Sequence, residues 1–322
     1  MKKIIALVMA LALVFTLCAC GGTGATTNST DMIMGTGGTA GTYYAYGGVL
    51  GGLIKSKTGI DVNVLSTDGS KANIIGIKKG NYQLGTVQSD VMAYAWEGTR
   101  TFEKEGKIDS FRTVAGLYAE TVQLVTMDPS IKSVKDLKGK KVSIGAPGSG
   151  VYFNAVDVLA AAGLTENDII AQKQSFGDSA ESLKDGKIDA AFIVAGAPTP
   201  AIQELSTTNN IYIVPIDGDV AAKLMEGDSS FYTVTRIPAN TYKGQSADVN
   251  TVSVKATLVV SASASEEDVY NLTKAIFDNI SSINHAKSAE LSIENATTGM
   301  AVPFHKGAAK YFAEKNVTVT AK

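Results

Sequence analysis

A glycine-rich segment that runs straight into a helical pattern limits the folds open to this chain more than any other feature. Residues 35–44 read Gly-Thr-Gly-Gly-Thr-Ala-Gly-Thr-Tyr-Tyr, a composition typical of a tight loop. From Tyr46 to Ile54, apolar side chains then recur at i, i+3, i+4, i+7 and i+8, the spacing of one face of an amphipathic helix. Strand-like and helical segments continue to alternate along the chain, which predicts an α/β fold with a parallel sheet covered by helices.

The loop before this helix has the properties of an anion site. The first backbone N–H groups of a helix have no carbonyl partner, and the helix dipole adds partial positive charge there. Threonine hydroxyls lie in the same segment. We therefore expect ligand contacts from Gly38, Thr39, Gly41, Thr42 and the tyrosine pair Tyr43 and Tyr44. Spacing alone does not say which tyrosine faces the ligand and which packs in the fold.

Two other interpretations of this loop are a dinucleotide-binding fingerprint and a purely structural turn. Gly35, Gly37 and Ala40 fit the pattern G-x-G-x-x-A. The next predicted strand, residues 60–65, does not end in the acid that would hold a ribose in that fingerprint. We favour the anion site over both alternatives.

The first 19 residues are typical of a bacterial signal peptide. Lys2 and Lys3 precede an apolar run from Ile4 to Leu17, which has the length of a signal h-region and is short for a membrane span. The run ends in Leu-Cys-Ala-Cys, which resembles the lipobox of bacterial lipoproteins. The resemblance implies cleavage before Cys20 and attachment of lipid to Cys20. The alternative is an ordinary secretory signal that is cut at the same place.

The segment after the leader predicts a tether. Residues 20–30 are small and polar, with nothing to bury, as in flexible linkers. The two cysteines, Cys18 and Cys20, both lie at the end of the leader, so no disulfide framework is possible. We expect a protein outside the cytoplasm, either anchored by lipid to the outer face of the cytoplasmic membrane or periplasmic.

The composition excludes several classes of function. Lys and Arg number 29 against 31 Asp and Glu, for a formal net charge of −2, and no basic patch indicates nucleic-acid binding. Two histidines, His285 and His305, and no cysteine beyond the leader argue against a zinc site. Neither histidine has a Ser, Cys or acid at motif spacing, and no G-x-S-x-G elbow occurs. We expect no enzymatic activity, no cofactor and no metal.

A second glycine loop leads into a second helix later in the chain. Residues 145–150 read Gly-Ala-Pro-Gly-Ser-Gly and precede a helical pattern from Tyr152 to Ala162. The glycine spacing is that of a P-loop, but Val151 and Tyr152 stand where a P-loop has Lys and Ser or Thr. A nucleotide site is therefore excluded, and the loop is expected to supply the other half of a ligand site.

Eight further candidates for ligand contact come from this loop and from predicted strands. They are Gln88, Glu120, Ser149, Gly150, Val151, Asn154, Phe192 and Gly196. Gln88 ends a predicted strand, where ligands lie in open α/β sheets. The hydroxyl of Ser149 either caps the helix or faces the ligand, and Asn154 points either to the cleft or to solvent. Glu120 either binds an ammonium group or holds a hinge, and Phe192 belongs either to the core or to the pocket wall.

Two long strand-like runs suggest how the chain is divided. Residues 113–126 and 251–261 bracket the second glycine loop, and we interpret them as crossover strands that join two lobes. Lobe 1 would hold residues 31–116 and 262–322, and lobe 2 residues 117–261. Without the leader roughly 300 residues remain, enough for two lobes of ordinary domain size.

Taken together, these motifs resemble those of a known family, the TAXI-type solute receptors of TRAP transporters. The residues that carry the resemblance are spread over the mature chain in the family's order. They are residues 35–44, 88–90, 117–120, 136–150 and 186–192, Gly196, Pro198 and residues 237–242. The resemblance implies a two-lobed periplasmic-binding fold of type II. It also implies a small carboxylate ligand, such as glutamate or a 2-oxoacid, bound between the lobes and presented to a membrane permease; we expect a monomer.

Two residues depart from the family pattern. Val151 stands where the family often has a threonine, and Gln123 where a histidine commonly follows the Glu120 region. The first departure removes a hydroxyl beside the expected ligand, which predicts a ligand that is either less polar at that end or different altogether. Two rival functions are a sensor lipoprotein that has no permease and an extracytoplasmic hydrolase that uses Ser149.

Overall fold

Two long antiparallel strands run through the middle of the molecule. The computed structural model describes residues 31–226 and 231–322, so the predictions for the leader, for Cys20 and for the tether lie outside the described residues. The strands are β1 (Met32–Gly35), β2 (Val62–Leu65), β3 (Leu84–Gln88), β4 (Phe111–Thr126), β5 (Lys141–Ser143), β6 (Ile170–Gln172), β7 (Ala190–Ala195), β8 (Tyr212–Val214), β9 (Thr233–Ile237) and β10 (Val249–Ser261). In the described residues they form one sheet in the order β2-β1-β3-β10-β4-β7-β5-β6, with β8 paired to β4 and β9 to β10.

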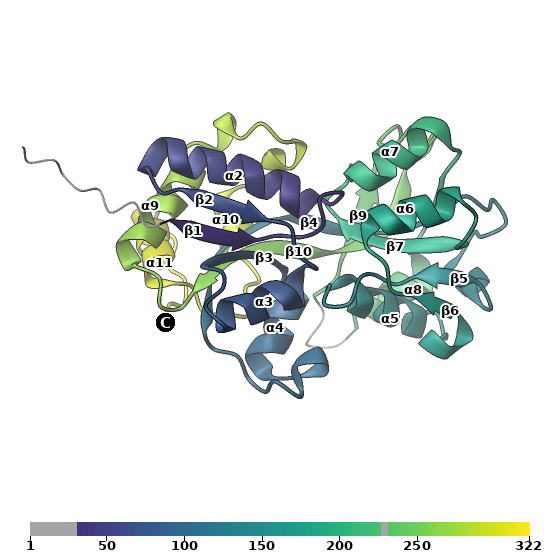
Figure 1. Ribbon diagram of the computed structural model, residues 1–322, viewed down its shortest axis with the longest axis horizontal. Helices are drawn as coiled ribbons and strands as arrows, with labels where there is room; N and C mark the ends of the chain where they lie inside the picture. The colour runs from purple at the N-terminus through teal and green to yellow at the C-terminus, as the bar shows by residue number, and fades with distance from the viewer. Residues whose placement is uncertain (1–30, 227–230) are drawn as a thin grey trace, which may run out of the picture.

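The strands β1, β2 and β3 form the sheet of lobe 1. They run parallel to one another, and β3 pairs antiparallel with β10. The helices of this lobe are α2 (Thr42–Thr58), α3 (Ser70–Lys78), α4 (Ser89–Glu97), α9 (Glu266–Phe277), α10 (Ile293–Thr297) and α11 (Lys306–Glu314). Figure 1 shows α2 on one face of these strands and α3 and α4 on the other. The first glycine loop thus connects β1 to a helix that covers the sheet.

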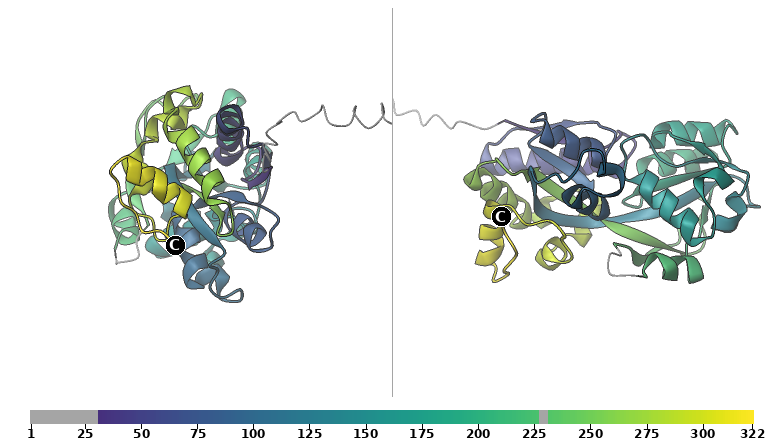
Figure 2. Two further views of the ribbon diagram at one scale, coloured as in Figure 1. Left: turned by 90° about the vertical axis from the view of Figure 1, so that its left-hand side faces the viewer. Right: turned by 90° about the horizontal axis from the view of Figure 1, so that it is seen from below.

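The second lobe repeats this arrangement. Its strands β5, β6 and β7 are parallel, and β7 pairs antiparallel with β4. The helices are α5 (Val151–Ala161), α6 (Phe176–Lys184), α7 (Pro200–Thr208) and α8 (Gly218–Leu224). The second glycine loop connects β5 to α5, so both predicted loops link a strand to a covering helix. The right-hand view of Figure 2 shows β4 and β10 passing from one lobe to the other.

Apolar residues fill both faces of each lobe's sheet. In lobe 1, Leu50 and Leu272 belong to the cluster on one face, and Ile74 and Met92 to the cluster on the other. In lobe 2 the corresponding clusters surround Phe192 and Ile202. Burial on both faces explains why β7 is apolar along its whole length.

Local signals in the sequence set several helix ends. Ser265 caps α9, because its side chain accepts a hydrogen bond from the Asp268 N–H, and three acids stand in the first turn. Gly163, just after α5, has φ +82, a conformation that glycine adopts without steric cost.

The two-lobed α/β fold with two crossover strands is confirmed. No helix among the described residues is long and apolar enough to cross a membrane.

Candidate functional site

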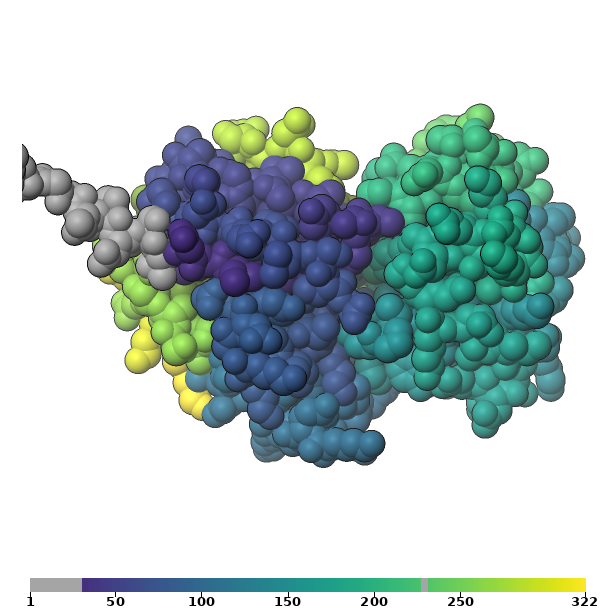
Figure 3. Space-filling model, in the orientation of Figure 1, coloured from purple at the N-terminus to yellow at the C-terminus, as the bar shows by residue number. Residues whose placement is uncertain are grey.

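A cavity of about 380 Å³ lies between the two lobes. Its walls are the loops that follow β1, β2, β5 and β6, together with the ends of β3 and β7. Because all of these are carboxyl ends of strands, the cavity occupies the position where open α/β sheets bind ligands. In Figure 3 the purple segment after β1 reaches the teal second lobe beside this cavity.

Five helices begin at the cavity, three from lobe 1 and two from lobe 2. The N-caps are Gly41 for α2, Gly69 for α3, Gln88 for α4, Gly150 for α5 and Ser175 for α6, and all five residues line the cavity. Among these helices, no side chain caps α2, α3, α4 or α5. Uncapped first turns leave N–H donors and partial positive charge directed at the space between them, which favours an anion.

The first turn of α3 is used for contact between the lobes. The backbone N–H groups of Lys71 and Ala72 donate to the Gly148 carbonyl in lobe 2, at 3.0 and 3.3 Å. On the other side of the cavity, the Ala201 N–H donates to the Ala40 carbonyl at 3.1 Å. The lobes therefore touch on both sides of the cavity, and α2 and α5 keep their first-turn donors for a ligand.

The first glycine loop forms one wall of the cavity, as predicted. Gly38, Thr39 and Gly41 line it. Thr42 also lines it, but its hydroxyl donates to the Gly196 carbonyl at 2.8 Å. The Thr42 hydroxyl hydrogen is thus engaged between the lobes, and ligand contact by Thr42 stays a prediction.

The structure distinguishes the two tyrosines. Tyr43 lines the cavity with 9% of its surface exposed, and its hydroxyl has no hydrogen-bond partner among the described residues. Burial and the nearby Glu120 carboxyl raise the pKa of the Tyr43 phenol, so it stays protonated and able to donate. Tyr44 is 36% exposed on the outer side of α2 and does not line the cavity.

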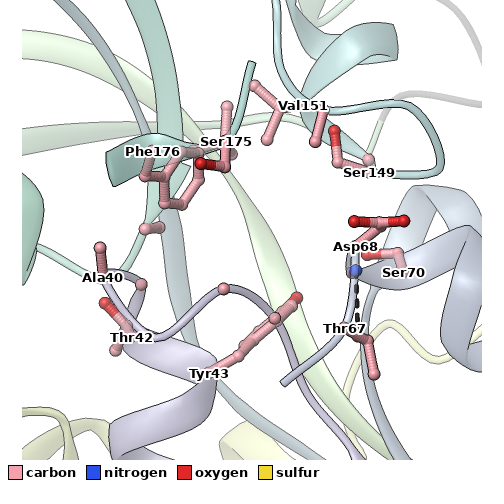
Figure 4. A pocket seen from close by; sticks show the side chains of 18 of the residues that line it. Ala40, Thr42, Tyr43, Thr67, Asp68, Ser70, Ser149, Val151, Ser175 and Phe176 are labelled. Carbon is pink, nitrogen blue, oxygen red and sulfur yellow. Dashed lines mark hydrogen bonds between the residues drawn. The ribbon is translucent and has the colours of Figure 1, made fainter. Parts of the chain in front are cut away.

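The wall from lobe 2 includes Ser149, Gly150 and Val151. The Ser149 hydroxyl is buried and has no partner among the described residues, so it faces the cavity without capping α5. A Cβ on Gly150 would lie 1.6 Å from the Gln88 Oε1 atom, which explains why only glycine fits there. Figure 4 shows Val151 and Ser149 opposite Tyr43 and Asp68.

Gln88 joins the cavity to a polar network behind it. Its Nε2 atom donates to Asn154 Oδ1 at 3.0 Å, while its Oε1 atom has no partner among the described residues. Asn154 Nδ2 in turn lies 3.0 Å from both Asp90 Oδ2 and the Tyr232 hydroxyl. Asn154 is fully buried, so it faces neither cleft nor solvent and instead ties α5 to lobe 1.

Two other candidates lie outside the cavity lining. Phe192 is fully buried in the core cluster of lobe 2, because its side chain points to the covered face of β7. Gly196 packs against Thr42, Tyr118 and Lys287, where a Cβ would come within 3.0 Å of each. Its placement as a ligand contact is therefore corrected to a point of close approach between the lobes.

Glu120 is the buried acid of the site. It lies on β4, is 2% exposed and lines the cavity, and its Oε1 atom has no partner among the described residues. Burial raises the pKa of Glu120 to about 8, although the charge of Lys287 acts in the opposite direction. The described lining residues include one other acid, the exposed Asp68, and no lysine, arginine or histidine.

Sequence reasoning missed two stretches of the wall and several single positions. The missed residues are Gly37, Ala40, Ser66–Ser70, Ala146, Ser175–Gly177, Val194 and Ala195. Both stretches follow short strands, β2 and β6, and each leads into a helix. Asp68-Gly69 is a turn signal that could have been found, since Gly69 has φ +100 and its N–H donates to Thr67 Oγ1 at 3.1 Å.

The histidines lie away from the cavity. His285 and His305 accept hydrogen bonds from the Lys287 and Gly307 N–H groups through Nδ1, so each caps a short helix. His305 is 5% exposed. Among the described residues, no group of three or more His, Cys, Asp or Glu side chains could hold a metal.

The comparisons with known proteins agree with this architecture. The model of the NMT1-like family matches residues 34–315. A solved protein structure from Bordetella bronchiseptica RB50 has a TM-score of 0.54 at 18% identity, covering 88% of this chain and 88% of that one. At this identity the likeness shows the fold.

Two further solved structures are sulfonate-binding proteins. The alkanesulfonate-binding protein SsuA from Xanthomonas axonopodis pv. citri, bound to MOPS, has a TM-score of 0.49 at 13% identity, covering 88% of this chain and 90% of that one. The periplasmic aliphatic sulphonate binding protein SsuA from Escherichia coli has a TM-score of 0.46 at 14% identity, with the same coverage of 88% and 90%. Since the family model covers most of the sequence, the chain belongs to the NMT1-like family.

Proposed function

We propose that this protein is the extracytoplasmic solute receptor of a membrane transporter and that it captures a small carboxylate by closing its two lobes. One observation carries the proposal. The uncapped first turns of α2 and α5, one from each lobe, begin at the same cavity. A carboxylate held between them gains donors from both lobes only when the lobes are closed, so binding favours closure.

The contacts around the cavity support a closed form. Thr42 donates to the Gly196 carbonyl on one side, and Gln88 donates to Asn154 on the other. Arg100 of lobe 1 also pairs with Asp157 of α5 at 2.7 Å. We assign residues 31–116 and 262–322 to lobe 1 and residues 117–261 to lobe 2, with hinges near 113–126 and 251–261.

The membrane partner is proposed to be a TRAP-type permease of the TAXI class. The motifs shared with that class support this proposal, together with the lipobox-like end of the leader. Lipid on Cys20 would hold the receptor at the membrane, and residues 20–30 would act as a tether long enough for it to contact the permease. Metabolic labelling with a palmitate analogue should label the wild-type chain and leave Cys20→Ser unlabelled.

A thermal-shift screen tests the carboxylate proposal. The panel holds amino acids, 2-oxoacids, dicarboxylates, sugars and alkanesulfonates. A ligand at about 100 times its dissociation constant adds roughly 2.7 kcal/mol of stability, which a melting curve resolves easily. We expect the hits to be carboxylates. A panel in which sugars or sulfonates shift the midpoint and no carboxylate does would refute the proposed function.

A further inference from the structure

We propose that the ligand is an α-amino acid with an uncharged, largely apolar side chain, and that Glu120 selects it by accepting a hydrogen bond from its ammonium group. This inference rests on the proposed carboxylate-receptor function and narrows it to one class of zwitterion. Three features of the cavity carry it: the state of Glu120, its position beside α2, and the apolar end of the cavity.

One oxygen of the Glu120 carboxyl lacks a hydrogen-bond partner in the site. This atom, Oε1, is buried and has no hydrogen bond among the described residues. The nearby cation Lys287 is engaged elsewhere, since its Nζ atom lies 2.5 Å from Glu290 Oε1. With a pKa of about 8, this carboxyl is mainly protonated near pH 7 in the free protein, and a donor with positive charge that binds to it stabilises the ionised form. A ligand ammonium group supplies that donor.

Glu120 lies beside the start of α2, where the ligand carboxylate is proposed to bind. A Cβ on Gly196 would come within 3.0 Å of both the Thr42 and Tyr118 side chains, and Thr121, next to Glu120, pairs with Ala195. The Glu120 charge acts on the Tyr43 phenol in the first turn of α2. An acceptor for an ammonium group and donors for a carboxylate are thus neighbours, as the two groups are in an α-amino acid.

The remaining wall of the cavity has no charge that could bind a second carboxylate. Val151, Phe176 and Val194 line it together with small residues. Figure 4 shows Phe176 and Val151 directed into the space from lobe 2. The described lining residues contain no lysine, arginine or histidine, and the acid Asp68 lies at the exposed rim. Because the first-turn donors of α2 and α5 are proposed to hold the main-chain carboxylate, a second, side-chain carboxylate such as that of glutamate would meet no charged partner in this wall, whereas an apolar side chain fits.

Isothermal titration calorimetry at pH 7 tests the inference with matched pairs of ligands. The pairs are alanine, valine, leucine and phenylalanine, each with its own 2-oxoacid, and L-glutamate is the charged comparison. We expect at least one of the four amino acids to bind about tenfold more tightly than its 2-oxoacid and than glutamate, because the 2-oxoacid lacks the donor for Glu120.

Two carboxyl-to-amide variants locate the effect. In Glu120→Gln we expect amino-acid affinity to fall about tenfold and 2-oxoacid affinity to change less than about threefold. Glu204→Gln makes the same chemical change on the exposed side of α7, outside the cavity lining, and should leave both affinities within about threefold. Melting of each variant without ligand shows whether it is folded. The comparison of each amino acid with its 2-oxoacid is made on the wild-type protein and does not depend on either variant.

The outcomes separate the inference from the function on which it rests. A 2-oxoacid that binds the wild type as tightly as its amino acid overturns the inference and leaves the carboxylate receptor standing. So does tightest binding of glutamate, or a folded Glu120→Gln protein that keeps its full affinity for the amino acid. If no carboxylate of any kind binds, the proposed function fails as well.

Discussion

The two glycine loops look alike in sequence but contribute differently to the cavity. The loop at residues 35–41 leads into α2 and carries the Tyr43 phenol, with the buried Glu120 carboxyl nearby. The loop at residues 145–150 leads into α5, which carries Val151, and Gly150 lies against the Gln88 side chain of the opposite lobe. We infer that the first loop recognises the charged end of the ligand and that the second adds its donors to that end when the lobes close.

The largest expected effect comes from filling the space at Gly150. An added Cβ would lie 1.6 Å from Gln88 Oε1, so Gly150→Ala must displace Gln88 and its bond to Asn154. We expect ligand affinity to fall by about tenfold or more, because closure loses a contact between the lobes. Gly38→Ala is the matched control, since nothing lies within 4 Å of a Cβ there. Equal effects of the two substitutions on affinity would contradict the difference between the loops.

Substitutions that remove two hydroxyl groups should affect different properties, one the stability of the unliganded protein and the other ligand affinity. The Thr42 hydroxyl donates to the Gly196 carbonyl, so Thr42→Val should cost about 1 kcal/mol of stability in the absence of ligand. The Ser149 hydroxyl has no partner among the described residues, so Ser149→Ala should leave the unliganded protein as stable and lower ligand affinity about fivefold. Urea unfolding and calorimetry measure the two quantities. A destabilised Ser149→Ala protein would mean that this hydroxyl has a structural role.

The acid beside the first loop should make the stability of the unliganded protein depend on pH. Burial raises the pKa of Glu120 to about 8 and that of Asp90 to about 7. A raised pKa in the folded state means that the stabilising contribution is complete below about pH 4, where the unfolded group titrates, and is lost as pH rises through the folded pKa. Stability should therefore decline between pH 5 and pH 9.

The Glu120→Gln variant isolates this effect. Burial lowers the pKa of His285 and His305. Because these groups make the folded protein more stable as pH rises over part of the same range, they oppose the decline. We expect the melting temperature of the variant to fall less than that of the wild type between pH 5 and pH 9, by about 3 °C. Parallel curves for the two proteins would show that Glu120 does not change its charge over this range.

The smallest expected effect distinguishes the two tyrosines. The Tyr43 hydroxyl is buried in the cavity wall without a partner, and Tyr44 is 36% exposed outside it. Tyr43→Phe should weaken ligand binding about threefold, whereas Tyr44→Phe should leave it unchanged. Titrations of both variants with the same amino acid measure the difference. A larger loss in Tyr44→Phe would place the ligand on the other side of α2.

Local sequence signals predicted the loops, the helices and the crossover strands. Glycine spacing and apolar periodicity act within a few residues, so the start of the helix after the second glycine loop was predicted to within a residue of Val151. The rotation of each helix about its axis depends on tertiary packing. The sequence therefore could not choose between Tyr43 and Tyr44, and it left open whether Phe192 lies in the core and whether Asn154 faces the cleft.

The topology of the sheet brings into the cavity wall the residues that the sequence motifs did not indicate. Ser66–Ser70 and Ser175–Gly177 carry no motif of their own, and they join the site because β2 and β6 end at the same edge of the sheet as β1 and β5. The unpartnered state of Glu120 also follows only from the fold, since Lys287 lies far along the chain and is bonded to Glu290. Residues distant in sequence thus decide which charge the cavity accepts.

A crystal structure of the protein with its bound carboxylate ligand tests the central claim most directly. The account predicts carboxylate oxygens within hydrogen-bond distance of the first-turn N–H groups of α2, with the Ser149–Val151 wall closed over the same molecule. A ligand bound to one lobe alone, or held outside the space between Tyr43 and Val151, would contradict it.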